Sequence, residues 1–476
     1  MNMKNKEVKI FLAGKFTATH QPLKVINPYD QTVVASTFLA SESELEAAIN
    51  AAQAVQEELK QLPAYDRYDI LMYISDQIQR QHEMFSHTLM LESGKPIKYA
   101  QAEIDRSIQT FRVAAEESRR HPREYLSLDW TPAGHKKEGL VRYFPVGLVA
   151  GISPFNFPLN LAVHKIAPAI AAGCPIILKP SSKTPLSTLA LAEIIAQTNL
   201  PPGAVSVLPM DRKTGNKLVT DPRFAMLSFT GSPEVGWKMK AEAGKKKVVL
   251  ELGGNAGVII AETADVDVAV VKCAGAAFAY SGQVCIHAQR LFVHQSIFDE
   301  FSKHFVKLTN KLRSGDPAHA DTDISSMIDE DNAIRVENWV NEAIHGGAEV
   351  LAGGSREGSF YPPTVLTRTH NEMKVCSREI FGPVVTLEPY AEFDEAIAFI
   401  NNTRFGLQAG VFTNKADEIN QAFNRIETGG VIINDVPTFR VDHMPYGGIK
   451  DSGFGREGLK YAIHDMLEPR ILVKDF

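Results

Sequence analysis

Apolar residues recur every three or four positions through residues 43–118, which is the spacing of one face of an α-helix. The pattern is clear in ESELEAAINAAQAVQEEL, in YDRYDILMYISDQIQRQHEMF and in IKYAQAEIDRSIQTFRVAAEESRR. Pro63 and the turn SGKP at residues 93–96 separate these segments, because proline and glycine interrupt helices. The sequence therefore predicts a group of amphipathic helices in this part of the chain.

From about residue 141 the pattern changes to short apolar runs that alternate with helical stretches, and a second such series extends from about residue 256 past residue 430. This alternation indicates βαβ units around a parallel sheet. We therefore predict an α/β fold with two doubly wound halves. The predicted strands are VRYFPVGLVAGI, IILK, VSVL, AMLSF, KVVLEL, RLFVHQ, PVVTLEPY and GGVIIND, and the predicted helices are LNLAVHKIAPAIAA, LSTLALAEIIAQ and segments around 212–220 and 233–242.

Residues 121–140 (HPREYLSLDWTPAGHKKEGL) break both patterns, because they are polar and are interrupted by proline and glycine. We expect them to leave the main body as an extended excursion. The chain contains no repeat of solenoid period and no low-complexity segment.

Composition and charge exclude several classes of protein. The chain has 476 residues, of which 44% are hydrophobic and 22% charged, and a net charge of −6 with both signs mixed. A nucleic-acid-binding face needs clustered basic residues, so no nucleic-acid partner is expected. The start has no apolar signal-peptide core, and there is no run of about 18 apolar residues, so we expect no membrane association. The four cysteines (Cys174, Cys273, Cys285 and Cys376) lack metal-site spacing, which predicts no metal and a cytoplasmic location.

Two glycine-containing segments are candidates for binding a dinucleotide. GFGREG at residues 453–458 matches G-x-G-x-x-G, but no βαβ unit can follow it, so we interpret it as a glycine-rich turn. FTGSPEVG at residues 229–236 follows a predicted strand and opens a helix, whose free N–H groups can bind phosphate. Ser232 could equally be an N-cap residue before a proline at the first helical position.

Four residues at predicted strand or helix ends form a candidate catalytic set. Cys285 in GQVC is the candidate nucleophile, although a lone cysteine is more often a buried structural residue. Glu251 ends the strand KVVLEL and could act as a general base, or it could be a surface residue before a turn. Asn156 in PFNFP offers an amide donor for an oxyanion, and Lys179 can contact a ribose or phosphate. Taken together, this set suits thioester chemistry.

The motifs that carry these residues resemble those of the aldehyde dehydrogenase superfamily, in its NAD(P)-dependent, non-phosphorylating, hydrolytic form. The resemblance covers nearly the whole chain, and Glu251 precedes Cys285 by 285 − 251 = 34 residues. It implies oxidation of an aldehyde to the acid through a thiohemiacetal and a thioester on Cys285. The motifs are, in order, NP at 27–28, PFNFP, ILKPSSKTP, FTGSPEVG, ELGGN, GQVC, EIFGPV and PYGGIKDSGFGREG.

The resemblance also implies residue roles. Cys285 is the nucleophile, Glu251 the base, and Asn156 with the Cys285 backbone N–H the oxyanion hole. Glu379 matches the ligand of the nicotinamide ribose, and Phe381 flanks the nicotinamide. The positions expected to bind NAD and/or NADP are Ile152, Ser153, Pro154, Phe155, Asn156, Lys179, Ser182, Gly231, Ser232, Leu252, Glu379 and Phe381.

The fold implied by the resemblance has two domains and an oligomerisation arm. We expect an NAD(P)-binding domain in residues 1–123 and 143–251 and a catalytic domain in residues 252–445. Residues 124–142 and 446–476 would form the arm and the C-terminal segment. The arm would join subunits into a homodimer or homotetramer.

Several positions depart from the commonest pattern of the family and concern the substrate. Ser182 stands where NAD-preferring members often carry glutamate, which predicts use of NADP as well as NAD. The candidate substrate-binding residues are Phe157, His164, His287 and Arg440. They predict a small polar aldehyde, such as a hydroxyaldehyde or a semialdehyde whose carboxylate pairs with Arg440, unless Arg440 is only an exposed or structural cation. The alternatives are a cysteine esterase or thioesterase on the same site, and a catalytically silent binding protein.

Overall fold

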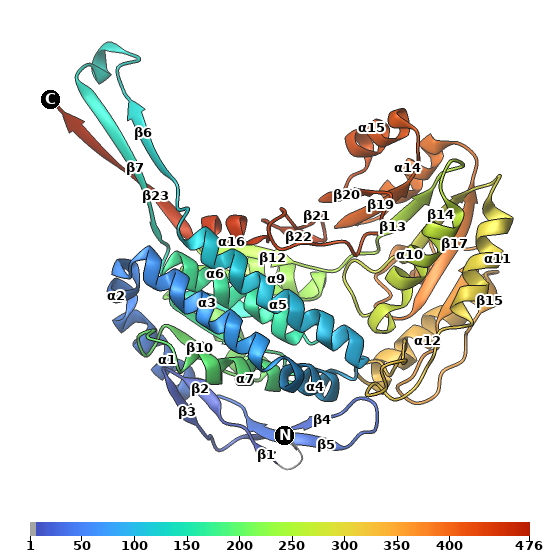
Figure 1. The fold of residues 1–476 in the computed structure, drawn as a ribbon, viewed down its shortest axis with the longest axis horizontal. Helices are drawn as coiled ribbons and strands as arrows, with labels where there is room; N and C mark the ends of the chain where they lie inside the picture. Colours follow the sequence, from blue (N-terminus) through green and yellow to red (C-terminus); the bar gives the residue numbers. More distant parts are fainter. Residues whose placement is uncertain (1–5) are drawn as a thin grey trace.

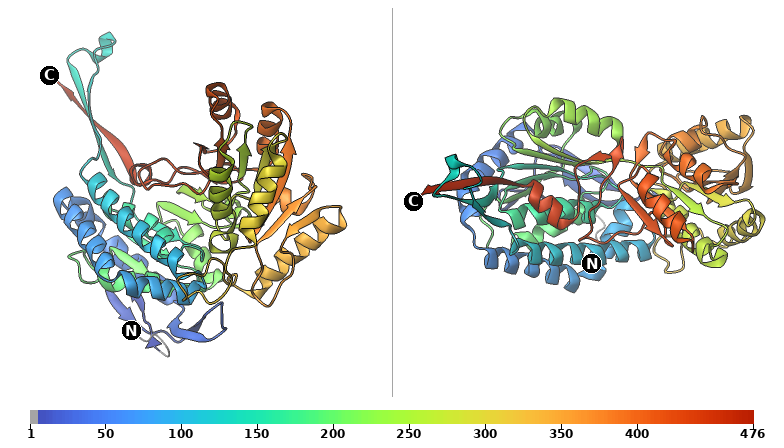
Figure 2. Two further views of the ribbon diagram at one scale, coloured as in Figure 1. Left: turned by 45° about the vertical axis from the view of Figure 1, so that its right-hand side comes forward. Right: turned by 90° about the horizontal axis from the view of Figure 1, so that it is seen from above.

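The computed structural model describes residues 6–476 and shows two α/β units side by side, with an arm that projects from the first unit (Figures 1 and 2). The sheet of the first unit contains β2 (Ile10–Leu12), β3 (Lys15–Thr17), β8 (Val149–Ile152), β9 (Ile176–Lys179), β10 (Val205–Val207), β11 (Met226–Thr230), β12 (Lys247–Glu251) and β22 (Gly453–Phe454). Its order is β22-β12-β11-β8-β9-β10-β2-β3. The five central strands are parallel, and β2 and β22 run antiparallel to their neighbours.

Helices cover both faces of this sheet, so consecutive strand residues are buried on opposite sides. Ile176 and Leu178 pack into one apolar cluster with α3, α5, α6 and α7, whereas Ile177 packs into the other with α1 and α8. Strands that are buried on both faces have continuous apolar sequences, which explains the apolar run in IILK. The helices of the unit are α1 (Glu42–Ala54), α2 (Gln56–Gln61), α3 (Ala64–Arg80), α4 (His82–Ser93), α5 (Ile97–Ser118), α6 (Pro158–Ala172), α7 (Leu186–Ile195), α8 (Arg212–Thr220), α9 (Pro233–Glu242) and α16 (Leu459–Asp465).

The second unit repeats this design around a sheet in the order β15-β16-β17-β14-β13-β19-β20, which is parallel except for β15. These strands are β13 (Gly257–Ile260), β14 (Arg290–His294), β15 (Glu349–Ala352), β16 (Thr364–Thr367), β17 (Val384–Tyr390), β19 (Gln408–Phe412) and β20 (Gly430–Ile433). Its helices are α10 (Val266–Phe278), α11 (Phe298–Thr309), α12 (Glu330–His345), α13 (Lys374–Ser377), α14 (Phe393–Asn401) and α15 (Ala416–Arg425). The prediction of two doubly wound halves is confirmed.

The arm is a three-stranded antiparallel sheet in the order β23-β7-β6. Its strands are β6 (Arg123–Ser127), β7 (Lys137–Pro145) and β23 (Leu467–Asp475). The prediction of one strand in VRYFPVGLVAGI is wrong, because the chain leaves β7 at Pro145 and turns through Gly147, whose φ is +120°, before β8 begins. Of residues 446–476, only β23 lies in the arm, since β22 joins the first sheet and β21 (Ile449–Lys450) pairs with β18 (Phe405–Gly406).

A small sheet of β1 (Lys6–Glu7), β5 (Val33–Phe38) and β4 (Pro22–Ile26) completes the described chain. None of the helices within residues 6–476 is both long and apolar enough to cross a membrane. The carboxyl ends of parallel strands meet at one edge of a sheet, where α/β proteins place their sites. Here the segments after β8, β9, β11 and β12 lie at that edge.

Candidate active site

The candidate nucleophile lies in a strained segment between α10 and β14. A short 3₁₀ turn (Ala279–Gly282) follows α10, and Tyr280 and Ser281 within it adopt left-handed φ angles of 49° and 51°. A Cβ on Gly282 would lie 2.1 Å from the carbonyl oxygen of Gly382, so this approach needs glycine. Left-handed non-glycine residues persist only where the surrounding structure holds them, and they gather at functional sites. Cys285 follows this turn after Gln283 and Val284.

Cys285 differs from the other three cysteines, which are buried, because its side chain is partly exposed. Its Sγ lies 3.2 Å from the hydroxyl oxygen of Tyr446. Burial raises the pKa of Cys285 to about 11, although the hydrogen bond with Tyr446 lowers it in part. The resting side chain is therefore a thiol, and Tyr446 can donate to the thiolate once the proton leaves.

Asn156 lies in the segment between β8 and α6 and points toward the nucleophile segment. Its side-chain Nδ2 donates to the carbonyl oxygen of Gln283 at 2.9 Å. An amide nitrogen carries two hydrogens, so one N–H remains for a ligand. The structure therefore brings the predicted oxyanion donor beside the residues that precede Cys285.

Glu251 is the last residue of β12 and is buried, yet neither carboxyl oxygen has a hydrogen-bond partner among residues 6–476. Burial raises its pKa well above the ordinary value, and the nearby charge of Glu457 raises it further. A buried carboxylate with a raised pKa binds a proton more readily than an ordinary one, which suits a general base.

A network of buried charges surrounds Glu251. Glu457 receives hydrogen bonds from Lys165 at 3.5 Å and from Arg440 at 2.9 Å, and all three side chains are at most 6% exposed. Burial raises the pKa of Glu457, but the two cations outweigh this effect and bring the pKa to about 2. Lys165 also donates to Thr230 at 2.8 Å. Arg440 is therefore a buried cation, and the alternative of an exposed one is excluded.

The network extends from Arg440 to a cavity of about 690 Å³ beside α5. His164 Nε2 lies 3.4 Å from Arg440 Nη2 and 3.1 Å from Asp442 Oδ1. Asp442 in turn pairs with Arg106 of α5 at 3.1 Å. Burial lowers the pKa of His164, and the charge of Arg440 lowers it further, so the imidazole is neutral. Arg440, Asp442 and Arg106 line the cavity, together with Arg112.

Tyr446 connects the cavity side of the network to the nucleophile. The guanidinium carbon of Arg440 lies 3.7 Å from the centre of the Tyr446 ring, and the hydroxyl of the same ring contacts Cys285. Phe157, one of the predicted substrate residues, packs with Tyr446 and Cys285 in a small apolar cluster. One aromatic ring therefore separates the candidate nucleophile from a buried cation.

The helix N-termini around the first sheet differ in whether they are free to bind an anion. Glu103 accepts two backbone N–H groups at the start of α6, each at 3.0 Å, and Glu92 accepts two at the start of α7, at 2.6 and 3.0 Å. Asp211 caps α8 at 2.7 Å. Within residues 6–476, no side chain caps α9, which begins after Ser232. The N-terminus of α9 is thus the one of these four left for a phosphate group.

Glu379 and Ser153 offer polar groups on the same side. Glu379 is half-buried and accepts the Gly254 N–H at 3.0 Å, and burial raises its pKa to about 8. A Cβ on Gly253 would lie 2.0 Å from Glu379 Oε2, so the glycine allows this approach. Ser153 is buried, and its hydroxyl has no partner within the described residues. Such unpaired buried groups fit a polar ligand.

The other predicted cofactor positions lie at the same edge. Phe155 and Phe381 meet edge to face with ring centres 5.8 Å apart, and the half-buried Lys179 ends β9. Ser182 donates to the carbonyl of Met210 at 3.4 Å, while the neighbouring Lys183 pairs with Asp329 of the second unit. Ile152 and Pro154 flank Ser153 after β8, and Gly231 and Leu252 follow the ends of β11 and β12.

His287 follows the candidate nucleophile by two residues and is buried. Burial lowers its pKa to about 4, although a hydrogen bond with the backbone of Ala277 raises it in part. Like Phe157 and His164, it does not line the cavity beside Arg440.

Sequence reasoning did not assign roles to Tyr446, Lys165 or Glu457. A signal existed for Lys165, because a lysine inside the apolar helix LNLAVHKIAPAIAA has to be buried against a partner. Glu457 lies in GFGREG, which forms β22 and the turn into α16. Nothing in the sequence indicated that Glu457 would meet Lys165, 292 residues away.

Comparison with known proteins identifies the family. The model of the aldehyde dehydrogenase family matches residues 16–472. The chain belongs to the aldehyde dehydrogenase family. It is similar to 3-sulfolactaldehyde dehydrogenase of Priestia aryabhattai, with 40% identity over 98% of both chains. The fold and reaction class predicted from the sequence are therefore confirmed.

Two solved structures show the same fold. Aldehyde dehydrogenase 21 from Physcomitrella patens, in complex with its reaction product succinate, is 45% identical, with 99% of each chain covered and a TM-score of 0.98. A glyceraldehyde-3-phosphate dehydrogenase from Methanocaldococcus jannaschii, complexed with NADP, is 39% identical, with 95% of this chain and 99% of that chain covered and a TM-score of 0.92.

Proposed function

We propose that this aldehyde dehydrogenase oxidises a short anionic aldehyde to its carboxylic acid through a thioester on Cys285. The Cys285 thiol first loses its proton to solvent. The thiolate then attacks the aldehyde carbon, and the Asn156 amide and a backbone N–H stabilise the oxyanion of the thiohemiacetal. After oxidation, Glu251 removes a proton from water, and the resulting hydroxide attacks the thioester. The carboxylic acid leaves, and the sulfur returns to the thiol.

We propose that NAD or NADP binds along the edge of the first sheet. The free N-terminus of α9 with Ser232 suits the pyrophosphate, Lys179 and Ser182 suit the adenosine ribose, and Glu379 suits the second ribose. When bound, the nicotinamide supplies the hydride acceptor for the oxidation. The unpaired hydroxyl of Ser153 and the absence of a side-chain cap on α9 within the described residues support this fit.

The observation that supports an anionic substrate is the position of Arg440, one aromatic ring away from Cys285. In this network, three cations (Arg106, Lys165 and Arg440) lie beside two carboxylates (Glu457 and Asp442). A carboxylate or sulfonate could pair with the guanidinium of Arg440 through charge-assisted hydrogen bonds. The names of the similar 3-sulfolactaldehyde dehydrogenase and of the succinate complex agree with such a substrate.

The matched pair 3-sulfolactaldehyde and lactaldehyde tests this proposal, because the two molecules differ by the sulfonate. We expect kcat/KM to be at least about 10²-fold higher for the anion, since a buried site built to pair a charge disfavours a ligand without it. Arg440→Gln should remove most of this preference, because it should lower kcat/KM for 3-sulfolactaldehyde much more than for lactaldehyde.

Arg112→Gln is the matched control, because Arg112 lines the same cavity but hydrogen-bonds to Gln79. It should retain most of the preference, because Arg440, and not Arg112, lies against the Tyr446 ring that contacts Cys285. A wild-type enzyme that uses lactaldehyde as well as 3-sulfolactaldehyde would contradict the anionic substrate.

Ser182 should allow NADP as well as NAD. A carboxylate at this position would repel the 2′-phosphate of NADP, whereas the serine hydroxyl does not. We expect Ser182→Glu to lower kcat/KM for NADP at least about tenfold and to change that for NAD little. Steady-state rates with each cofactor measure the ratio. An unchanged ratio, or a wild type that ignores NADP, would show that another group selects the cofactor.

The arm supports the proposal of a homodimer or homotetramer. Tyr125, Trp130 and Phe476 on it are 65%, 91% and 69% exposed, and so much exposed aromatic surface is typical of an interface between subunits. We also propose a cytoplasmic location, because four free cysteines fit a reducing compartment. The domain boundaries at residues 123, 143, 251 and 445 remain part of this proposal.

A further inference from the structure

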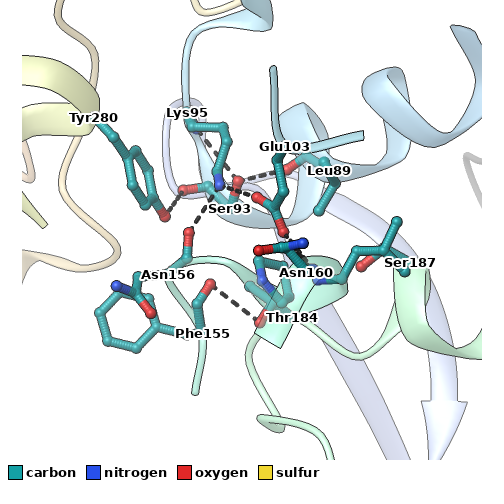
Figure 3. A network of polar contacts seen from close by, with 12 residues as sticks. Leu89, Ser93, Lys95, Glu103, Phe155, Asn156, Asn160, Thr184, Ser187 and Tyr280 are labelled. Carbon is teal, nitrogen blue, oxygen red and sulfur yellow. Dashed lines mark hydrogen bonds and ion pairs between the residues drawn. The ribbon is translucent and has the colours of Figure 1, made fainter. Parts of the chain in front are cut away.

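The buried ion pair of Lys95 and Glu103 lies next to Asn156 and has no part in the chemistry above (Figure 3). Lys95 belongs to the turn between α4 and α5, and Glu103 belongs to α5. Both side chains are 0% exposed. Removing two charges from water is costly, so such a pair is retained for stability or for a specific geometry.

Glu103 uses its two oxygens for different contacts. Oε1 accepts the backbone N–H groups of Leu159 and Asn160, each at 3.0 Å, and Oε2 accepts from Lys95. Leu159 and Asn160 are the second and third residues of α6, the helix that follows Asn156. The carboxylate therefore fixes the start of this helix.

Lys95 contacts the asparagine itself. Its Nζ donates to the backbone carbonyl oxygen of Asn156 at 2.8 Å. The same ammonium lies 4.4 Å from the ring centres of both Phe157 and Tyr280. Phe157 follows Asn156 in the chain, and Tyr280 lies in the strained turn before Cys285. Lys95 thus stands between the segment with the oxyanion donor and the segment with the nucleophile.

Two further hydrogen bonds close a ring of contacts around Lys95. The Tyr280 hydroxyl donates to the carbonyl of Ser93, in the turn that carries Lys95, at 3.2 Å. Asn156 Nδ2 donates to the carbonyl of Gln283 at 2.9 Å. The Asn156 amide is therefore held both through its own backbone and through the nucleophile segment.

We propose that Lys95 and Glu103 are positioning residues that hold the Asn156 amide at the oxyanion of the Cys285 adduct. This inference rests on the proposed role of Asn156 as an oxyanion donor. A donor accelerates the reaction only if it already points to the place where charge develops, so the residues that fix it control the rate of the first step. Lys95 and Glu103 touch neither substrate nor cofactor.

The test is the rate constant of the first burst of NAD(P)H, measured with the full-length double variant Lys95→Met/Glu103→Gln. This variant removes both charges together, so no buried charge is left alone. We expect the burst to slow by about tenfold to 10²-fold, the effect of a small displacement of a catalytic group. The Kd of the cofactor should change by less than about threefold, since the carbonyl of Asn156 is the one group of the proposed cofactor positions that the pair contacts among residues 6–476.

A cycle with Asn156→Ala separates positioning from general loss of structure. Asn156→Ala alone should slow the burst by about 10²–10³-fold. In that background Lys95→Met/Glu103→Gln should slow it by less than about threefold further, because there is no amide left to position. If the effects of Asn156→Ala and of Lys95→Met/Glu103→Gln multiply fully, the positioning role is overturned. If Asn156→Ala alone leaves the burst unchanged, the proposed oxyanion donor is overturned instead.

Two more variants keep the test decisive. Tyr280→Phe removes only the hydroxyl that bonds to Ser93. It should slow the burst severalfold in the wild type but not in Asn156→Ala. If the double variant does not fold, Tyr280→Phe provides the test in its place. Glu92→Gln is the matched control, because Glu92 caps α7 in the same way without contacting Asn156. A burst slowed equally by Glu92→Gln would overturn the proposal.

Discussion

Replacing Cys285 by alanine is expected to lower aldehyde oxidation by at least about 10⁴-fold, because the reaction then has no nucleophile to form the thioester. Cys285 is the one cysteine of the four that is not buried, and its sulfur meets Tyr446 at 3.2 Å. Single-turnover formation of NAD(P)H with excess enzyme measures the loss without interference from slow turnover.

Cys273→Ala is the matched control. Cys273 is fully buried in the apolar core of the second unit, and burial raises its pKa far above the ordinary value. Its replacement should lower the melting temperature slightly and leave turnover intact, since a small cavity is the only change. Substantial oxidation by Cys285→Ala would contradict covalent catalysis at this residue.

Glu251→Gln is expected to give one equivalent of NAD(P)H per active site and then to slow steady-state turnover by about 10²–10⁴-fold, the usual effect of removing a positioned base. The glutamine has the same shape, and the glutamate oxygens have no partners within residues 6–476, so the fold should persist. A steady-state rate like that of the wild type would show that another group activates water.

The pH dependence of deacylation should reflect the ionisation of Glu251. Burial and the charge of Glu457 raise the pKa of Glu251, and the deprotonated form is the one that acts. The deacylation rate of the wild type should therefore rise with pH through this raised pKa. As the pH is lowered, the rate should begin to drop at a higher pH than it would with an ordinary carboxyl group. In Glu251→Gln this limb of the profile should be absent.

Much of the fold could be predicted because local pattern and tertiary burial agree. The apolar spacing of residues 43–118 predicts helices that the structure contains as α1 to α5, and the short runs from IILK to GGVIIND appear as strands. The sequence predicts one strand over both β7 and β8, because residues 141–152 are mostly apolar. Only the positive φ of Gly147 separates them, and a sequence does not show a backbone angle.

The sequence predicts the catalytic residues of the candidate site but not the buried charges around them. Motifs marked Cys285, Glu251 and Asn156, since each stands where a strand or helix ends. The buried network could not be predicted, because Lys165 pairs with Glu457, which lies far along the sequence in the turn between β22 and α16. Arg440 was expected to meet a substrate, but the sequence did not show that Tyr446 would lie between it and the nucleophile. Such pairings depend on long-range packing rather than on local pattern.

The most direct test of the account is the mass of the enzyme trapped during turnover. Glu251→Gln is mixed with cofactor and the preferred aldehyde, quenched with acid after the burst, and digested. The account predicts one acyl group, with the mass of the substrate acid less water, on the peptide that contains Cys285, in an amount equal to the NAD(P)H formed. A full burst with no acyl group on that peptide, or with the group on another residue, would contradict it.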